Sequence, residues 1–283
     1  MRIGVIAPSC PLDESLPLQI KALAQSHFGS DAPEIVFHPQ CFLSEGHFAG
    51  PDSARTQAFV EFANDSAFDA VWCARGGYGA CRIAGPAIGQ LGPAAHDKLY
   101  LGYSDAGFLL GGLYARGIGR VAHGPMPADL GRDGGQAALL RALDWFVNPD
   151  ANKTGHDASA AIHITPPLVR PRERVAAFNL TVLCAMIGTP LMPDLTDHVL
   201  MVEEVGEYMY RIDRSLFQLT SNPTIRAVAG IKLGRISAVP DNLPNFAMNE
   251  EQLIAHWCAV SGIAYLGRAD IGHDGDNKVV PFG

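Results

Sequence analysis

The chain has 283 residues, of which 48% are hydrophobic and 18% are charged. This composition excludes a largely disordered protein and leaves room for two domains of roughly 100 to 170 residues. The formal net charge of −8 disfavours nucleic acid and anionic membrane surfaces as partners. A small or peptide-like ligand fits this charge better.

The six cysteines are scattered along the chain and include no Cys-x-x-Cys pair. This spacing indicates neither a zinc ribbon nor a dense disulfide framework, so we expect reduced and mostly buried thiols. The first residues, Met-Arg-Ile-Gly-Val-Ile-Ala-Pro-Ser, lack the long apolar segment of a signal peptide, and no run is long enough to span a membrane. These features predict a cytoplasmic protein.

The first half of the chain alternates short apolar runs with amphipathic stretches. Strands are expected at residues 2–7, 34–38, 70–74, 99–102 and 120–123. Helices are expected at residues 17–27, 53–63, 106–115 and 135–147. This alternation is typical of a mostly parallel sheet with helices on both faces, where ligands bind at the carboxyl ends of the strands.

A change in composition divides the chain. Residues 148–156 are turn-rich and residues 165–171 are punctuated by prolines. We therefore predict an N-terminal α/β domain over 1–150, a linker over 151–175 and a smaller C-terminal α/β domain over 176–283. In the second domain we expect helices and strands at 180–187 (helix), 198–205 (strand), 210–219 (helix), 227–233 (strand) and 249–260 (helix).

Ser104 follows the predicted strand at 99–102 and directly precedes a helical stretch. A parallel sheet can hold a nucleophile at this place. A serine before a helix is more often an N-cap residue, and this alternative stays open. Gly102 agrees with the Gly-x-Ser-x-Gly turn of α/β-hydrolases, but position 106 is alanine, so that particular turn is disfavoured.

The sequence Arg75-Gly76-Gly77-Tyr78-Gly79 follows another apolar run. Its glycines allow the backbone to approach a ligand closely, although their spacing matches neither of the common phosphate-binding motifs. We expect N–H groups of this loop and of Asp105 to form an oxyanion hole, as acyl transfer requires.

A serine nucleophile also needs a base and an acidic partner. His123 lies at the end of a predicted strand, and His273 lies in a turn-rich loop before the final strand. The chemistry alone does not choose between them. Glu203 and Glu204 lie in an apolar strand and point to opposite faces, so one of them should point inward toward a histidine. The alternative is an edge strand with both carboxylates in water.

These stretches together resemble the LD-carboxypeptidase family of serine peptidases over almost the whole chain. The segments that carry the resemblance, in chain order, are Ile3-Gly-Val-Ile-Ala-Pro-Ser9, Ala74-Arg-Gly-Gly-Tyr-Gly79, Gly102-Tyr-Ser-Asp105, His123-Gly-Pro-Met126, Asn179-Leu-Thr-Val-Leu183, Val202-Glu-Glu-Val-Gly-Glu207 with Tyr210-Arg-Ile-Asp-Arg214, and Gly272-His273 ahead of Val280-Pro-Phe-Gly283.

The resemblance implies specific roles for residues that the chemistry left open. Ser104 would be the nucleophile, Glu203 the acid and His273 the base, with the site between the two domains. His123 would then be structural, and Glu204 would point away from the site. The family also implies a homodimer without a cofactor or metal.

The implied activity is removal of the terminal D-alanine from a murein tetrapeptide in peptidoglycan recycling. The substrate-binding residues would include the oxyanion groups of Gly76, Gly77 and Asp105. An arginine should bind the terminal carboxylate, and the candidates are Arg75, Arg82 and Arg211. The alternatives are a microcin-resistance peptidase of the same family and a non-catalytic two-domain protein that binds a small ligand.

Overall fold

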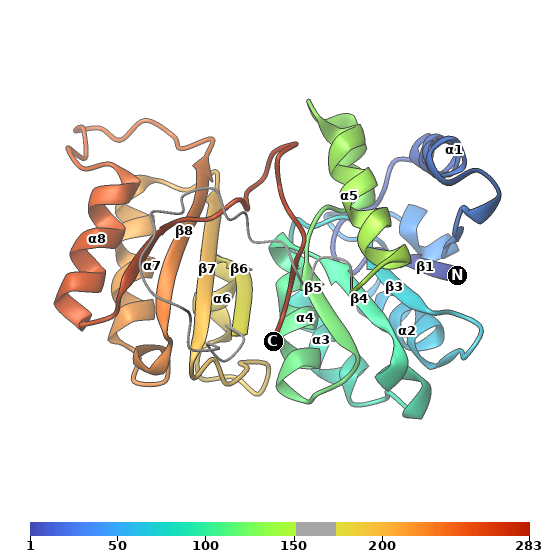
Figure 1. Cartoon of the computed structure of the whole chain (residues 1–283), viewed down its shortest axis with the longest axis horizontal. Coiled ribbons are helices and arrows are strands. Elements are labelled where there is room, and N and C mark those ends of the chain that lie inside the picture. The colour runs from blue at the N-terminus through green and yellow to red at the C-terminus, as the bar shows by residue number, and fades with distance from the viewer. Residues whose placement is uncertain (151–173) are drawn as a thin grey trace, which may run out of the picture.

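A six-stranded sheet organises the first part of the chain in the computed structural model, which describes residues 1–150 and 174–283 (Figure 1). The strand order is β10-β5-β4-β3-β1-β2, and all neighbouring pairs are parallel except β10 with β5. The first five strands are β1 (Arg2–Ile6), β2 (Glu34–Phe37), β3 (Ala70–Cys73), β4 (Leu99–Gly102) and β5 (Arg120–His123). All five predicted strands of this half are thus confirmed.

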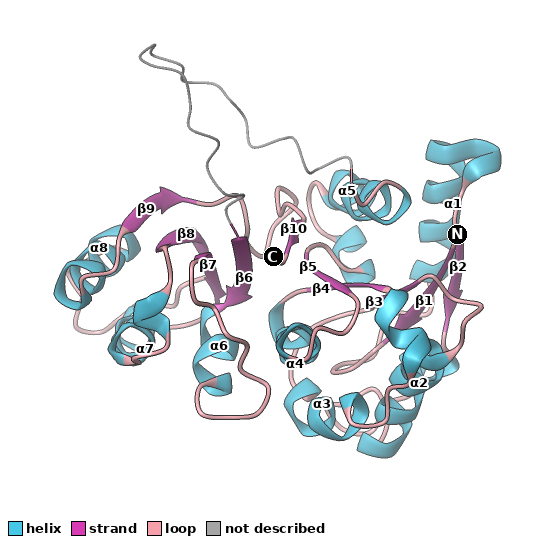
Figure 2. Ribbon diagram, turned by 60° about the horizontal axis from the view of Figure 1, so that its bottom comes forward, coloured by secondary structure: helices cyan, strands magenta, loops and turns pink. Residues whose placement is uncertain are grey.

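Helices cover both faces of this sheet (Figure 2). One face packs against α1 (Leu16–Phe28) and α5 (Gly135–Val147), and the other against α2 (Asp52–Asn64), α3 (Ala80–Ile88) and α4 (Gly107–Ala115). Because both faces are covered, the central strands β3 and β4 are buried along their whole length. The predicted mostly parallel sheet is therefore confirmed.

Helix α3 is missing from the predicted elements because it contains Gly85 and Pro86, which disfavour a helix interior. Its apolar face explains why it forms: the buried side chains recur at helical spacing, and they are Ala80, Ile83, Ala84, Ala87 and Ile88. Tertiary burial outweighs the local propensity here.

A second, smaller sheet contains four parallel strands in the order β6-β7-β8-β9. They are β6 (Arg174–Asn179), β7 (His198–Val205), β8 (Gly230–Ser237) and β9 (Tyr265–Arg268). Helices α6 (Leu180–Met186), α7 (Met209–Ser221) and α8 (Glu250–Ser261) lie on one face (Figure 2). No helix within the described ranges is both long and apolar enough to cross a membrane.

The predicted elements of this second part omit β6 and β9 and start β8 too early. The linker expected over 151–175 lies outside the described residues up to position 173, and Arg174 and Val175 already belong to β6. Strand β9 contains Gly267 and is alternately exposed, so it lacks the apolar run that identifies a buried strand.

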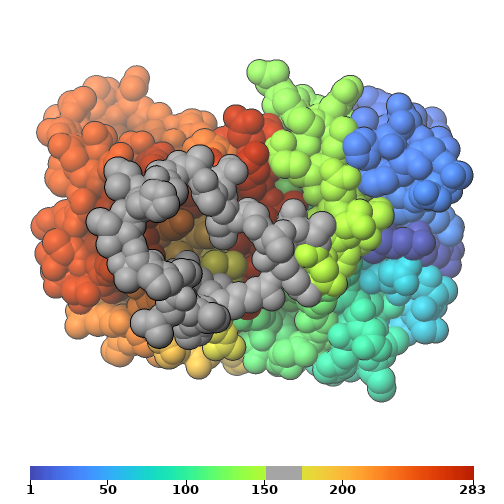
Figure 3. Space-filling model, viewed as in Figure 1, coloured from blue at the N-terminus to red at the C-terminus, as the bar shows by residue number. Residues whose placement is uncertain are grey.

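The end of the chain returns to the first sheet as β10 (Val280–Pro281), which pairs antiparallel with β5. The N–H of Phe282 donates to the carbonyl of Val121 at 2.8 Å, and the N–H of Gly283 donates to the carbonyl of Val175 in β6 at 3.0 Å. The C-terminal segment therefore bonds to both sheets, and it lies between the two lobes in the space-filling view (Figure 3).

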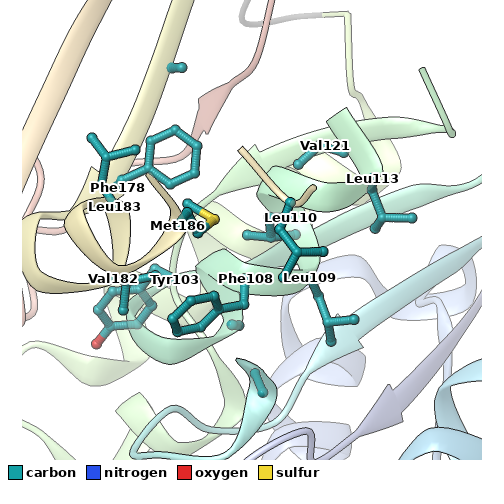
Figure 4. Packing of buried hydrophobic residues seen from close by; sticks show 14 of the residues in the cluster. Tyr103, Phe108, Leu109, Leu110, Leu113, Val121, Phe178, Val182, Leu183 and Met186 are labelled. Carbon is teal, nitrogen blue, oxygen red and sulfur yellow. The ribbon is translucent and has the colours of Figure 1, made fainter. Parts of the chain in front are cut away.

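The two lobes share one hydrophobic core where α4 packs on α6 (Figure 4). Glycines on α4 permit this contact: a Cβ at Gly107 would lie 3.0 Å from Val182, and one at Gly111 would lie 2.8 Å from the sulfur of Met186. The core continues into Phe178 of β6 and Phe108 of α4. Because α4 directly follows Ser104, this packing sets the second lobe beside the serine.

The cysteines agree with the expectation of reduced thiols. All six are free, and only Cys81 is not buried. Burial raises the pKa of the Cys41 and Cys73 thiols to about 12, so these two remain protonated near neutral pH.

Candidate active site

Ser104 lies on a tight turn between β4 and α4 and has a φ of +58°. A positive φ is uncommon for a residue other than glycine and marks local strain. The N-cap residue of α4 is Ala106, and no side chain caps this helix or the short 3₁₀ turn Ser104–Ala106 before it. Ser104 is therefore not an N-cap, and its partly exposed hydroxyl sits at the carboxyl end of a buried strand, as a nucleophile requires.

The glycine loop 75–79 lies directly against Ser104 because β3 and β4 are adjacent parallel strands. A Cβ at Gly76 would come within 2.9 Å of both the Cβ and the Oγ of Ser104. Gly77 has a φ of +111° and Gly79 a φ of +135°, conformations that side chains rarely allow. The absence of a side chain at Gly76 therefore allows the loop to approach the serine closely, and the positive φ angles at Gly77 and Gly79 require glycine for the backbone of the loop.

The carboxylate of Asp105 locks the backbone of this turn. Its Oδ2 accepts a hydrogen bond from the Ser9 hydroxyl at 2.5 Å and another from the Ala80 N–H at 2.8 Å. Burial raises the pKa of Asp105, and these two hydrogen bonds oppose the increase. The backbone N–H groups of Gly77 and Asp105 donate no hydrogen bond within residues 1–150 and 174–283, so both remain available to an oxyanion.

Glu203 and His273 form a buried pair in the second lobe. His273 Nδ1 donates to Glu203 Oε2 at 2.6 Å, and the side chains are 7% and 0% exposed. Glu203 stands near the carboxyl end of β7, and Gly234 of β8 makes room for it, since a Cβ there would lie 2.9 Å from the Cβ of Glu203. Burial raises the pKa of Glu203, whereas the hydrogen bond from His273 lowers it.

This hydrogen bond has a chemical consequence. When Nδ1 of His273 donates to Glu203, the other ring nitrogen, Nε2, is left as a proton acceptor. The carboxylate also stabilises the imidazolium that forms when Nε2 accepts a proton. The pair therefore has the properties of a general base with its orienting acid.

Glu204 points to the opposite face of β7 and binds only structural groups. It accepts hydrogen bonds from the Asn179 side chain at 2.8 Å and from the N–H and hydroxyl of Thr181 at 2.9 and 2.7 Å. The alternative of a solvated edge strand is wrong, because β7 lies between β6 and β8 and both glutamates are buried.

Tyr103 connects the serine turn to the Glu203–His273 pair. Its ring centroid lies 4.8 Å from that of His273, and its hydroxyl donates to Asp129 at 2.8 Å. Arg132 pairs with Asp129 at 3.1 Å and also donates to the backbone carbonyl of His273. No hydrogen bond joins Ser104 to His273 among the described residues. The ring of Tyr103, the residue before Ser104, contacts the ring of His273.

The loop that carries His273 is held by the first lobe. Arg141 of α5 donates to the carbonyls of Gly275 and Asn277, and the side chain of Asn277 accepts from the N–H of Gly272 at 3.2 Å. Sequence reasoning missed Arg132, Asp129 and Arg141, because their partners are far away in the chain. Tyr103 alone was detectable, as a tyrosine between a strand and the candidate nucleophile.

His123 is buried next to the same tyrosine, with ring centroids 5.4 Å apart. Burial, and to a smaller extent the nearby His273, lower its pKa to about 3. An imidazole with so low a pKa is a weak base near neutral pH, so the geometry favours a structural role.

This pKa shift predicts a pH dependence of stability. The unfolded chain binds a proton at His123 below about pH 6.5 and the folded protein does not until about pH 3, so the folded state loses stability as the pH falls through this window. We expect the loss to be smaller in His123→Gln, by up to about 1.4 kcal/mol per pH unit. Urea unfolding of both proteins between pH 4 and 7 measures this, and parallel curves would contradict it.

The three candidate arginines differ in their partners. Arg82 binds both oxygens of Asp52 at 3.0 and 2.9 Å, and Arg211 lies 3.6 Å from Glu207. Arg75 donates only to the carbonyl of Pro11, at 3.3 Å, and pairs with no carboxylate in the described part of the chain. Arg75 directly precedes Gly76, the glycine that packs against Ser104, and it is the candidate without an acidic partner in the described part of the chain.

The fold and this site define a two-lobed α/β protein with a strained serine on one lobe and a Glu–His pair on the other. Residues 3–124 match the LD-carboxypeptidase N-terminal domain, and residues 174–283 match the LD-carboxypeptidase C-terminal domain. The chain belongs to the LD-carboxypeptidase family, as its resemblance implied.

One relative and two solved structures illustrate the similarity. The murein tetrapeptide carboxypeptidase of Pseudomonas aeruginosa is 29% identical over 76% of this chain and 70% of its own. The muramoyltetrapeptide carboxypeptidase of Oxalobacter formigenes has the same fold, with a TM-score of 0.80 and 24% identity. The match covers 100% of this chain and 93% of that one. MccF, solved with glutamyl sulfamoyl guanosine, shares the fold at a TM-score of 0.75 and 17% identity. That match covers 100% of this chain and 91% of MccF.

Proposed function

We propose that this protein is a serine LD-carboxypeptidase that removes the terminal D-alanine from murein tetrapeptides. The observation that carries the proposal is the buried Glu203–His273 pair, whose histidine is in ring contact with Tyr103, the residue directly before the strained Ser104. The name of the Pseudomonas relative supports murein tetrapeptide as the substrate. Such a reaction belongs to peptidoglycan recycling, and for this chain we propose a cytoplasmic homodimer.

In this mechanism His273 Nε2 accepts the proton of the Ser104 hydroxyl as the oxygen attacks the carbonyl of the diamino acid residue. The oxyanion that forms accepts hydrogen bonds from the N–H groups of Gly77 and Asp105, with Gly76 giving the loop its close approach. His273 then gives its proton to the leaving amine, and D-alanine departs. Water, activated by the same imidazole, hydrolyses the acyl-enzyme and restores Ser104.

A carboxypeptidase must also recognise the free terminal carboxylate. We assign this role to Arg75, because Arg82 and Arg211 each have an acidic partner and Arg75 has none among the described residues. A guanidinium binds a carboxylate through two parallel hydrogen bonds, which orients the terminal residue as well as holding it.

The proposed function is tested by incubating the purified protein with murein tetrapeptide and following tripeptide and D-alanine by mass spectrometry. Release of D-alanine is the expected result, and a protein that cleaves no murein tetrapeptide contradicts the proposal. An aminoacyl sulfamoyl nucleotide serves as the second substrate, since faster cleavage of that compound would favour the microcin-resistance alternative instead.

Gly76→Ala should reduce the activity while leaving the fold in place. The added Cβ would lie 2.9 Å from Ser104 Oγ and would displace either the nucleophile or the oxyanion loop. We expect kcat/KM to fall by about 100-fold, corresponding to about 2.7 kcal/mol of transition-state stabilisation. Gly85→Ala is the matched control, because a Cβ at Gly85 meets nothing within 4 Å. If Gly76→Ala and Gly85→Ala had the same kcat/KM, the close contact of the loop with Ser104 would be refuted.

A further inference from the structure

Arg55 of α2 is fully buried, at 0% exposure, next to the end of the glycine loop. A buried guanidinium is costly unless its charge and its N–H groups are compensated. Its carboxylate partner is Asp52, which is 40% exposed and also binds Arg82 through both oxygens. Because Asp52 is shared and partly in water, this ion pair by itself does not explain why an arginine lies in the interior.

The guanidinium of Arg55 also binds three backbone carbonyls. Nη1 donates to the carbonyl of Pro8 at 2.5 Å and to that of Gly79 at 3.0 Å, and Nε donates to that of Gly50 at 3.3 Å. Pro8 follows β1 and Gly79 ends the loop after β3, so the guanidinium joins loops that leave two adjacent strands. A Cβ at Gly79 would lie 2.8 Å from Nη1, so the missing side chain makes this contact possible.

The peptide group between Gly79 and Ala80 connects Arg55 to Asp105. Its carbonyl accepts a hydrogen bond from Arg55, and its N–H donates to Asp105 Oδ2 at 2.8 Å. The negative end of the peptide dipole thus faces the cation, and the positive end faces the carboxylate. Both hydrogen bonds involve a charged group and polarise the same peptide, so each strengthens the other.

A second connection runs through the loop after β1. The carbonyl of Pro8 accepts from Arg55, and the hydroxyl of the next residue, Ser9, donates to Asp105 Oδ2 at 2.5 Å. Burial raises the pKa of Asp105, and the positive charge of Arg55 opposes this increase. Arg55 therefore supports the ionised carboxylate that accepts both hydrogen bonds, and it also fixes the segments that donate them.

We propose that Arg55 is a positioning residue for the oxyanion hole. It fixes two loop segments that hold Asp105, so the N–H groups of Gly77 and Asp105 keep their places while charge develops on the substrate oxygen. The inference rests on the proposed function, in which these two N–H groups act. Since Arg55 has no exposed surface, it acts through the backbone, on kcat more than on KM.

The kinetic test compares wild type with Arg55→Lys and Arg55→Met. Lysine keeps the positive charge and the apolar stem but lacks the planar fork of N–H groups that spans the two loops. We expect kcat for tetrapeptide to fall about tenfold in Arg55→Lys and about 100-fold in Arg55→Met, with KM within about twofold of wild type. A purely structural role would lower the thermal transition and leave the kcat of the folded enzyme unchanged. That result in Arg55→Lys overturns the proposal, also where Arg55→Met does not fold.

Arg226→Met is the matched control. Arg226 also donates to a backbone carbonyl, that of Thr220 at 3.1 Å. It precedes β8, so it lies at the edge of the second sheet opposite to Glu203. This control should keep the wild-type kcat. If its kcat fell as much as that of Arg55→Met, the loss would not be specific to the oxyanion loop, and the proposal would be overturned.

Hydrogen exchange separates the role of Arg55 from the proposed reaction. The Ala80 N–H reports the link to Asp105, and the amides of the buried strand β4 report global unfolding. Relative to the β4 amides, exchange at Ala80 should be about tenfold faster in Arg55→Lys than in wild type, and unchanged in Arg226→Met. This result supports the positioning role even if the protein cleaves no tetrapeptide. Unchanged relative exchange at Ala80 in Arg55→Lys overturns the inference, whatever the enzyme cleaves.

Discussion

Ser104→Ala is expected to abolish the release of D-alanine, with kcat reduced by about 10⁴-fold or more. The hydroxyl oxygen is the atom that forms the acyl-enzyme, and neither Gly77 nor Asp105 can replace it. Binding should persist, since Arg75 and the glycine loop do not depend on this oxygen. Single-turnover kinetics with tetrapeptide measures the chemical step, and isothermal titration measures binding.

The same variant distinguishes an enzyme from a binding protein. If the protein were a non-catalytic two-domain binding protein, wild type and Ser104→Ala would bind the peptide with the same affinity. Neither of them would hydrolyse it. Thr181→Ala is a suitable control, because Thr181 contacts Glu204 on the face of β7 away from His273. If Ser104→Ala retained wild-type turnover, the serine would not be the nucleophile.

Glu203→Gln is expected to reduce kcat by about 10⁴-fold while the shape of the site is kept. The amide of glutamine can donate to Nδ1 of His273, which would move the proton to Nε2 and remove the base facing Ser104. The uncharged amide would also fail to stabilise the imidazolium. Steady-state kinetics of the folded variant, confirmed by its thermal transition, measures this effect.

Glu204→Gln provides the adjacent comparison. Its carboxylate accepts hydrogen bonds from Asn179, Thr181 and Val205, so the change should lower the thermal stability more than the activity. A loss of kcat in Glu204→Gln as large as in Glu203→Gln would show that both variants act through disruption of β7, and would remove the special role of Glu203.

Local sequence patterns were sufficient for most of the fold. Apolar runs such as 70–74 and 99–102 predict buried parallel strands because both faces of such a strand must be covered. The same reasoning failed for α3, whose Gly85 and Pro86 oppose a helix, and for β9, which is short, partly exposed and interrupted by Gly267. In these elements long-range packing outweighs local preference.

The candidate site likewise has one part that local sequence patterns predict and another that they do not. The position of Ser104 after an apolar run and the glycines at 76, 77 and 79 are local signals, and the structure places the first of these glycines against Ser104. The choice of His273 over His123 came from resemblance and not from chemistry. The structure adds a physical reason: His123 is buried with its pKa lowered to about 3, whereas His273 is bonded to Glu203.

By itself the sequence determined the strand–helix alternation, the place of the serine and the sites where only glycine allows close approach, because these depend on neighbouring residues. The tertiary structure alone decided which side chains meet. Glu203 and His273 come from β7 and from the loop after β9, and Tyr103, Asp129 and Arg132 join them from the first lobe. Such contacts depend on how sheets and helices pack, which no local pattern specifies.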